Sequence, residues 1–133
     1  MFYKFNLNLK LTVVAFVIAI LYIYIDREIY GETFVKEIRL ADRENSLGVL
    51  PDAQLIQLGR EVCSKAGNWD GFEDSNKDIA QEIAKALVTM GDNTLIVESS
   101  SIVTFLRYQS IYELCPENIS ILSRLIEHKE NSD

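Results

Sequence analysis

The chain has 133 residues and a formal net charge of −7, and 48% of its residues are hydrophobic, which is enough for one domain with a small core. From Asp26 onward there are 11 Lys or Arg against 20 Asp or Glu, a net charge of −9. An acidic chain without a basic stripe lacks the phosphate-neutralising charge that binding to nucleic acid or to anionic lipid headgroups requires. Neither is expected as a partner.

A positive N-terminus precedes a long apolar run. Residues 1–10 carry Lys4 and Lys10, and residues 11–25 are almost entirely apolar. Counted from Leu7, the run spans about 28 Å as a helix, close to the thickness of the hydrocarbon core of a bilayer. The pattern predicts a short cytoplasmic N-terminus, a transmembrane signal anchor over residues 11–25, and the rest of the chain outside the cell.

The end of the apolar run indicates whether this leader is cleaved. Signal cleavage needs small residues at the cut, and Ile23-Tyr24-Ile25 offers none. Ile29-Tyr30-Gly31 is a poor site. We therefore expect an uncleaved, single-pass anchor in the cell membrane, with secretion after signal cleavage as the alternative. A buried core helix is disfavoured because no later segment is apolar enough to surround it.

Residues 26–50 are predicted to form a juxtamembrane helix and a turn. Tyr30, Phe34 and Ile38 recur every fourth residue, which favours a helix over residues 27–42. Residues 43–50 are then typical of a turn.

Residues 51–117 contain both cysteines of the chain. Pro51 suits the first position of a helix. Leu55, Val62 and Cys63 recur at helical spacing, so Cys63 is expected on the buried stripe of that helix.

A loop is predicted over residues 67–74, between the first cysteine helix and the next helix. Ser75 suits the N-cap of that helix, with Asp78 three residues on as a short form of the capping box. Ile83 lies on its apolar face, and Gly91 suits its C-terminal stop.

A single long helix is predicted from Thr94 to Cys115, where Pro116 stops it. Ile111 lies on the same stripe as Cys115, so both sulfurs are expected to point toward one core. The serines at 99–101 lie inside this helix and are weak helix formers.

Two cysteines that share a core can be buried free thiols, half of a metal site or a disulfide. A metal site needs more soft ligands, and the only histidine, His128, stands in a charged tail. A location outside the cell favours a disulfide over free thiols.

Three stretches of the chain resemble a known family. They are Phe34-Val-Lys-Glu-Ile-Arg39, Asp52-Ala-Gln-Leu-Ile-Gln-Leu-Gly-Arg-Glu-Val-Cys63 and Cys115-Pro-Glu117. Together they are similar to the domain-of-unknown-function family numbered 732, whose members are small, exported, two-cysteine helical proteins of actinobacteria and their phages. The resemblance implies a disulfide between Cys63 and Cys115 and implies no activity. The chain is richer in Asn, Lys and Ile than this Ala-rich family, which suggests a phage or low-GC relative.

The expected fold class is therefore all-α. An N-terminal transmembrane anchor helix is followed by a small disulfide-linked helical bundle of about four or five helices. Residues 118–133 complete it as a C-terminal amphipathic helix, marked by Ile119, Leu122 and Leu125, and a polar tail.

Trp69 and Phe72 lie in the acidic loop and allow two interpretations. If exposed, they are the best candidates for binding a partner, because aromatic side chains anchor interfaces. If buried, they cover the disulfide and the open end of the bundle, which is the interpretation we favour.

No motif predicts a cofactor, a metal site or catalysis. Asp74-Ser-Asn-Lys-Asp78 begins like a calcium loop, but Ile79 and Lys85 stand where such a loop needs Gly and Glu. Neither Gly-x-Ser-x-Gly nor Cys-x-x-Cys occurs. A carboxylate pair such as Glu61 and Glu113, each close to a cysteine in sequence, could serve a glycosidase, although such a pair arises easily by chance among twenty acidic residues.

Two functional hypotheses follow. The first is a membrane-anchored extracytoplasmic binding or structural module with a protein partner in the envelope, in a phage or envelope setting. The alternative is a carboxylate-based hydrolase acting on cell-envelope glycans. Self-association through the membrane helix or the Tyr30–Ile38 stripe is weakly supported, because the apolar run lacks a Gly-x-x-x-Gly pair.

Overall fold

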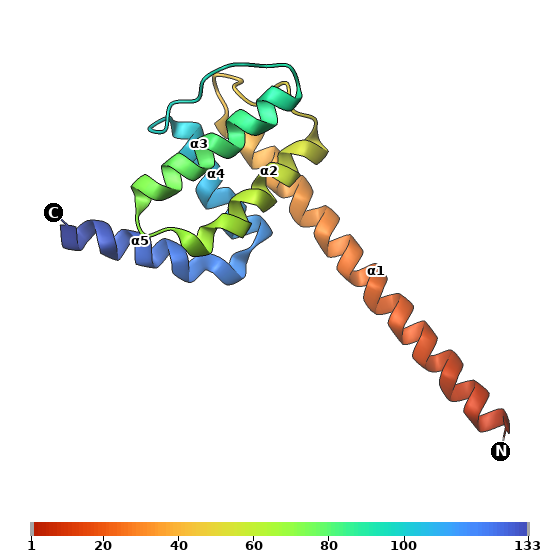
Figure 1. Cartoon of the computed structure of the whole chain (residues 1–133). Helices are drawn as coiled ribbons and strands as arrows, with labels where there is room; N and C mark the ends of the chain where they lie inside the picture. The colour runs from red at the N-terminus through yellow and green to blue at the C-terminus, as the bar shows by residue number, and fades with distance from the viewer. Residues whose placement is uncertain (1, 133) are drawn as a thin grey trace. The chain divides into compact units, whose positions relative to one another are not determined.

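The computed structural model describes residues 2–132, with the side chains of residue 6 and of residues 8–23 and 31–132. The described residues form helices and no strand, which confirms the predicted all-α class (Figure 1). The α-helices are α1 (Phe2–Ala41), α2 (Asp52–Lys65), α3 (Phe72–Thr89), α4 (Ser101–Gln109) and α5 (Ile119–Ser132). Between them lie the 3-10 helices η1 (Ala66–Asn68) and η3 (Pro116–Asn118) and the π-helical turn η2 (Ser110–Leu114). The chain divides into two units, Met1–Tyr30 and Gly31–Asp133.

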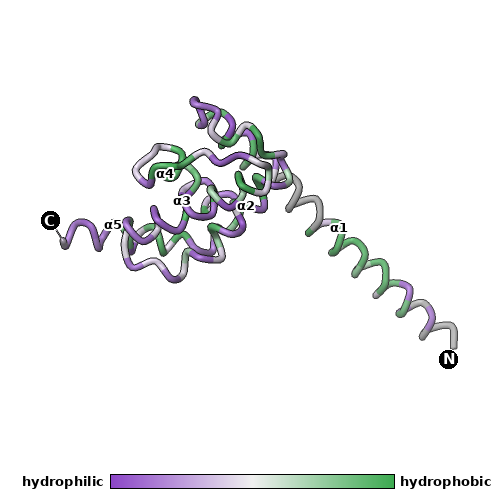
Figure 2. Tube along the Cα trace, turned by 45° about the horizontal axis from the view of Figure 1, so that its top comes forward, coloured by the Kyte–Doolittle hydropathy of each residue, from purple (hydrophilic) through white to green (hydrophobic). Residues whose placement is uncertain are grey.

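In the first unit, every described side chain of residues 8–23 is exposed, and most are apolar. Figure 2 shows them as a hydrophobic run along α1. In the part of the chain that the structure describes, no helix is both long and apolar enough to span a membrane. The predicted span over residues 11–25 ends with Tyr24 and Ile25, whose side chains lie outside the described residues.

The second unit is built around one hydrophobic core, to which the end of α1 and each of the α-helices α2 to α5 contribute. In Figure 1, α5 runs along the lower side of this unit and the loop of residues 92–100 along its upper side. Phe34 and Ile38 are fully buried in the core rather than exposed for self-association, while the side chain of Tyr30 lies outside the described residues. The largest fully buried side chains are Trp69, Phe34, Ile38, Leu47, Leu50, Leu55, Ile79, Ile83, Leu87, Leu106, Ile111 and Leu125.

The turn after α1 is held by side chains at the end of that helix. The Asp42 carboxylate accepts hydrogen bonds from the backbone N–H groups of Ser46 (2.9 Å) and Leu47 (2.8 Å). Arg39 donates to the carbonyl oxygen of Leu47 (2.7 Å) and to that of Leu50. These bonds satisfy backbone groups that no helix can satisfy in the turn, and they allow Leu47 and Leu50 to enter the core.

The start of α3 differs from the prediction. The helix begins at Phe72, with Gly71 at the N-cap position, so Ser75 lies inside it. Ser75 is fully buried, and its hydroxyl donates to the carbonyl oxygen of Phe72 (3.1 Å) while accepting from Arg107 Nε (2.7 Å). The predicted N-cap is therefore wrong, because the hydroxyl is used in a contact with another helix.

The end of α3 agrees with the prediction. Gly91 has φ +76°, the left-handed conformation that glycine adopts without strain. Its N–H bonds to the carbonyl of Val88 (3.0 Å), and the N–H of Asp92 bonds to that of Leu87 (2.9 Å). This pair of bonds is the Schellman motif, which satisfies the last carbonyls of the helix.

The continuous helix predicted from Thr94 to Cys115 is wrong. The chain has no regular structure over residues 92–97, and α4 starts only at Ser101. The carboxylate of Asp92 accepts hydrogen bonds from the N–H and hydroxyl of Thr94, a local turn that competes with helix. Beyond α4 the chain widens into η2, where the N–H of Cys115 reaches the carbonyl of Ser110 (3.1 Å).

Two further boundaries also differ. Pro51 has an extended conformation and precedes α2 as its N-cap residue instead of opening the helix. At the other end of the chain, α5 continues to Ser132, so the polar tail predicted after the amphipathic helix is helical almost throughout.

Candidate functional site

The two cysteines form the predicted disulfide. Cys63 comes from α2 and Cys115 from the residue after η2, with their Cα atoms 6.1 Å apart across a sequence separation of 52 residues. The side-chain amide of Asn118 donates to the carbonyl of Cys63 (3.4 Å), which adds a second link between the same two segments. Neither sulfur is free to act as a nucleophile.

Trp69 is a packing residue. Its side chain is only 1% exposed, and its indole N–H donates to the carboxylate of Asp78 (3.0 Å). Its carbonyl oxygen accepts a hydrogen bond from Arg124 on α5 (2.9 Å). Trp69 therefore fits the packing interpretation and does not present an exposed anchor, while Phe72 is half-buried at the start of α3.

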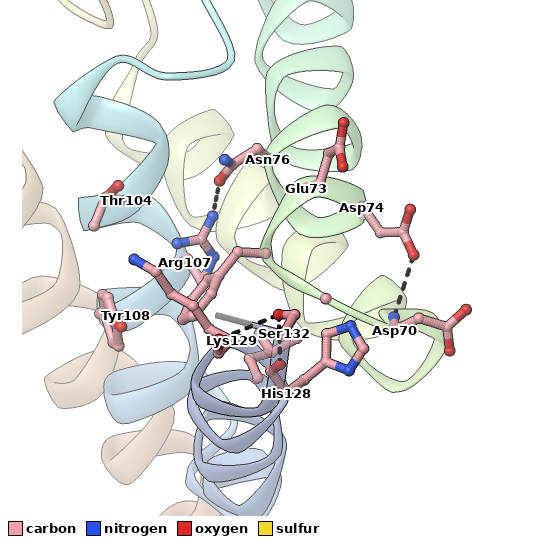
Figure 3. A pocket seen from close by; sticks show the side chains of 13 residues that line it. Asp70, Glu73, Asp74, Asn76, Thr104, Arg107, Tyr108, His128, Lys129 and Ser132 are labelled. Carbon is pink, nitrogen blue, oxygen red and sulfur yellow. Dashed lines mark hydrogen bonds between the residues drawn. The ribbon is translucent and has the colours of Figure 1, made fainter.

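A cavity of about 600 Å³ lies between the start of α3, α4 and α5, and we call it the arginine pocket (Figure 3). Arg107 of α4 lines it and is 3% exposed. Its Nε donates to Ser75 (2.7 Å) and its Nη2 to the side-chain oxygen of Asn76, both on α3. Its guanidinium also lies over the ring of Phe72, 5.0 Å from the ring centroid.

The charge of Arg107 has no negative partner within the described part of the chain. No described carboxylate forms an ion pair with the guanidinium, and the groups that bond to it are neutral. Burial lowers the pKa of Arg107 from its ordinary value, an effect that Tyr108 partly offsets. Because arginine stays protonated in proteins, Arg107 carries a buried positive charge that forms no ion pair with a described carboxylate.

Glu82 on α3 shows the opposite arrangement. Its carboxylate is buried, but it lies 2.6 Å from Lys65 Nζ and 3.0 Å from Lys85 Nζ. Burial raises the pKa of Glu82, yet the hydrogen bonds from the two lysines outweigh burial and leave the pKa below its ordinary value. This cluster lines neither cavity and is a structural tie between α2 and α3.

A second concavity of about 710 Å³ is bounded by the end of α1, the loop of residues 92–100 and α4. We call it the apolar groove, because Leu40, Leu95, Val97 and Phe105 line it with exposed side chains. Leu95 is 89% exposed and Val97 65% exposed. Ser100 Oγ, also in the groove, is buried and has no hydrogen-bond partner among the described residues.

The carboxylate pair considered from sequence does not belong to either concavity. Glu61 and Glu113 line neither the arginine pocket nor the apolar groove. No group of three or more potential metal ligands occurs among the described residues.

Sequence reasoning missed Arg107. The signal that could have indicated it is an arginine within a mostly apolar helix, directly after the buried Leu106.

Comparison of the chain with models of known families, with curated proteins and with solved structures finds no match. The resemblance to family 732 therefore stays a prediction.

Proposed function

We propose that the chain is a membrane-anchored extracytoplasmic binding module that holds a protein partner in the apolar groove. The observation that carries this proposal is the groove itself. Leu95, Val97 and Phe105 are large apolar side chains that remain exposed around one concavity, and contiguous exposed apolar surface is typical of interaction sites.

Two observations support the location. Disulfides persist in oxidising compartments outside the cytoplasm, and this fold contains one. The described residues 13–23 of α1 also expose a continuous series of mostly aliphatic side chains, which a lipid environment would cover. Export of Gly31–Asp133 with an uncleaved leader accounts for both.

The charges around the groove specify the chemistry of the partner. Three acidic residues, Glu37, Asp42 and Glu44, line it together with one basic residue, Arg43. Interfaces commonly combine an apolar centre with a polar rim. We therefore expect a protein surface with apolar side chains at its centre and basic residues beside them.

The test is photocrosslinking of the full-length chain in its native membrane, with a photoreactive residue at Leu95. We expect one discrete crosslinked protein, and we expect Phe105→Asp in the same chain to remove it. Val88→Asp is the matched control, because Val88 is exposed on α3 and does not line the groove. A crosslinked band that survives Phe105→Asp, or that Val88→Asp removes equally, would refute the groove as the binding site.

A further inference from the structure

The arginine pocket has the features of a ligand site that is separate from the apolar groove, since the two concavities share no lining residue. Arg107 is almost completely buried, and no described carboxylate forms an ion pair with it. A buried charge without a counter-charge is unfavourable for folding. An anion bound from outside the chain would supply the missing partner.

The guanidinium also retains hydrogen-bonding capacity. Nε and Nη2 have acceptors on α3, whereas Nη1 has none among the described residues. Figure 3 shows Lys129 extending from α5 toward the side of the pocket where Thr104 and Tyr108 stand on α4. One side of the pocket therefore brings together two cations and two hydroxyl groups, all able to donate hydrogen bonds to an anion.

The other side of the pocket restricts which anion fits. Asp70, Glu73 and Asp74 also line the cavity, and Figure 3 shows their carboxyl groups on the side away from Thr104 and Tyr108. These acids repel a doubly charged phosphate more strongly than a singly charged carboxylate. Phe72 and Leu125 form an apolar part of the pocket wall. The cavity, of about 600 Å³, is large enough for a whole small molecule.

We infer that the arginine pocket binds a monocarboxylate with an aromatic or aliphatic body. The carboxylate accepts a charge-assisted hydrogen bond from Nη1 of Arg107, the guanidinium nitrogen that has no acceptor among the described residues. Lys129 and the hydroxyl groups of α4 complete the anion site, and the body of the ligand lies against the apolar wall.

The binding test uses the full-length chain in lipid nanodiscs, titrated with 3-phenylpropionate and followed by the NMR signals of arginine side-chain N–H groups and backbone amides. We expect a saturable shift centred on Arg107. The neutral amide of the same acid should bind about tenfold more weakly, because it lacks the charge-assisted bond. Equal binding of the amide would refute the charge pairing. Saturable binding of inorganic phosphate without binding of 3-phenylpropionate would overturn the carboxylate assignment.

Exposed residues of the pocket permit variants that keep the fold. Lys129→Gln and Thr104→Val should each weaken binding several-fold, since both side chains are exposed and line the cavity. Lys36→Gln is the matched control, because it removes the same charge from an exposed site on α1 outside the pocket. If Lys36→Gln lowered the affinity for 3-phenylpropionate as much as Lys129→Gln does, the effect would come from net charge alone. That result would refute the arginine pocket as the binding site.

Discussion

The Cys63–Cys115 bond joins α2 to the end of η2 across 52 residues of sequence. Removing it releases the unfolded chain from that constraint, which on the chain-entropy model costs about 4 kcal/mol. We expect Cys63→Ser and Cys115→Ser to lower the free energy of unfolding by the same amount, and the double variant to be no less stable than either single one. Denaturant unfolding of the three variants measures this. A clearly additive double variant would show that the two sulfurs contribute independently.

Glu82 should make the stability of the fold sensitive to acid. Its pKa in the folded chain lies below the ordinary value of 4.5 despite burial, because Lys65 and Lys85 bond to the ionised form. A carboxyl group with a lowered folded-state pKa stabilises the fold above its unfolded-state pKa, and this contribution is lost as the pH falls through the folded-state value.

We therefore expect Glu82→Gln to reduce the free energy of unfolding at neutral pH and to flatten its decline below about pH 4.5. Urea unfolding over a series of pH values measures both effects. Glu127→Gln is the control, since Glu127 is exposed on α5 and forms no ion pair with a described residue. If the free energy of unfolding declined with falling pH equally in the wild type and in Glu82→Gln, Glu82 would not be the source of the acid sensitivity.

At the scale of elements, Gly59 lets α2 approach its neighbours closely. A Cβ atom at this position would lie 2.6 Å from Leu114 Cδ1 and 2.6 Å from Phe34 Cζ. Gly59→Ala should therefore lower the free energy of unfolding by about 1–3 kcal/mol, the usual cost of overpacking a core. Gly67→Ala is the control, because a Cβ atom there would meet nothing within 4 Å. Denaturant unfolding of both variants compares them, and equal stability would show that the core adjusts freely around Gly59.

The ends of a helix were predicted correctly where the hydrogen bonds that fix them join residues close in the sequence. They were predicted wrongly where those bonds join residues far apart in the sequence. Gly91 was predicted correctly because the bonds that stop α3 come from residues within the same turn. Ser75 was not predicted correctly, because its hydroxyl also bonds to Arg107, which is 32 residues away in the sequence. The helix predicted from Thr94 failed at its start, where the structure shows residues 92–97 without regular structure and Leu95 and Val97 exposed.

The candidate sites follow the same rule. The disulfide could be predicted because few chemistries are open to two cysteines that share a core, and the predicted location outside the cell favours a disulfide over free thiols. The arginine pocket could not, because it depends on Arg107 meeting Ser75, Asn76 and Phe72 from another helix. An isolated arginine in a sequence is most often a solvated surface residue.

At the scale of the whole molecule, the proposed membrane anchor and the disulfide can be tested together. If the apolar run of α1 both directs export and holds the chain in the membrane, its disruption should leave the chain in the cytoplasm with reduced cysteines. Val14→Asp combined with Ile18→Asp places two charges in that run, where each is costly in lipid. We expect the variant to leave the carbonate-resistant membrane fraction and Cys63 and Cys115 to become reactive toward a thiol-alkylating reagent.

The matched control is Leu95→Asp, which also introduces a charge at an exposed apolar position but lies outside the run. It should stay in the membrane fraction with the cysteines paired, even though it alters the apolar groove. The two readouts test two separate roles of the same helix. A doubly charged variant that leaves the membrane but keeps its disulfide would show that residues 11–25 retain the chain without directing export. One that stays in the membrane would refute the anchor, because no other described helix offers a comparable run of exposed apolar side chains.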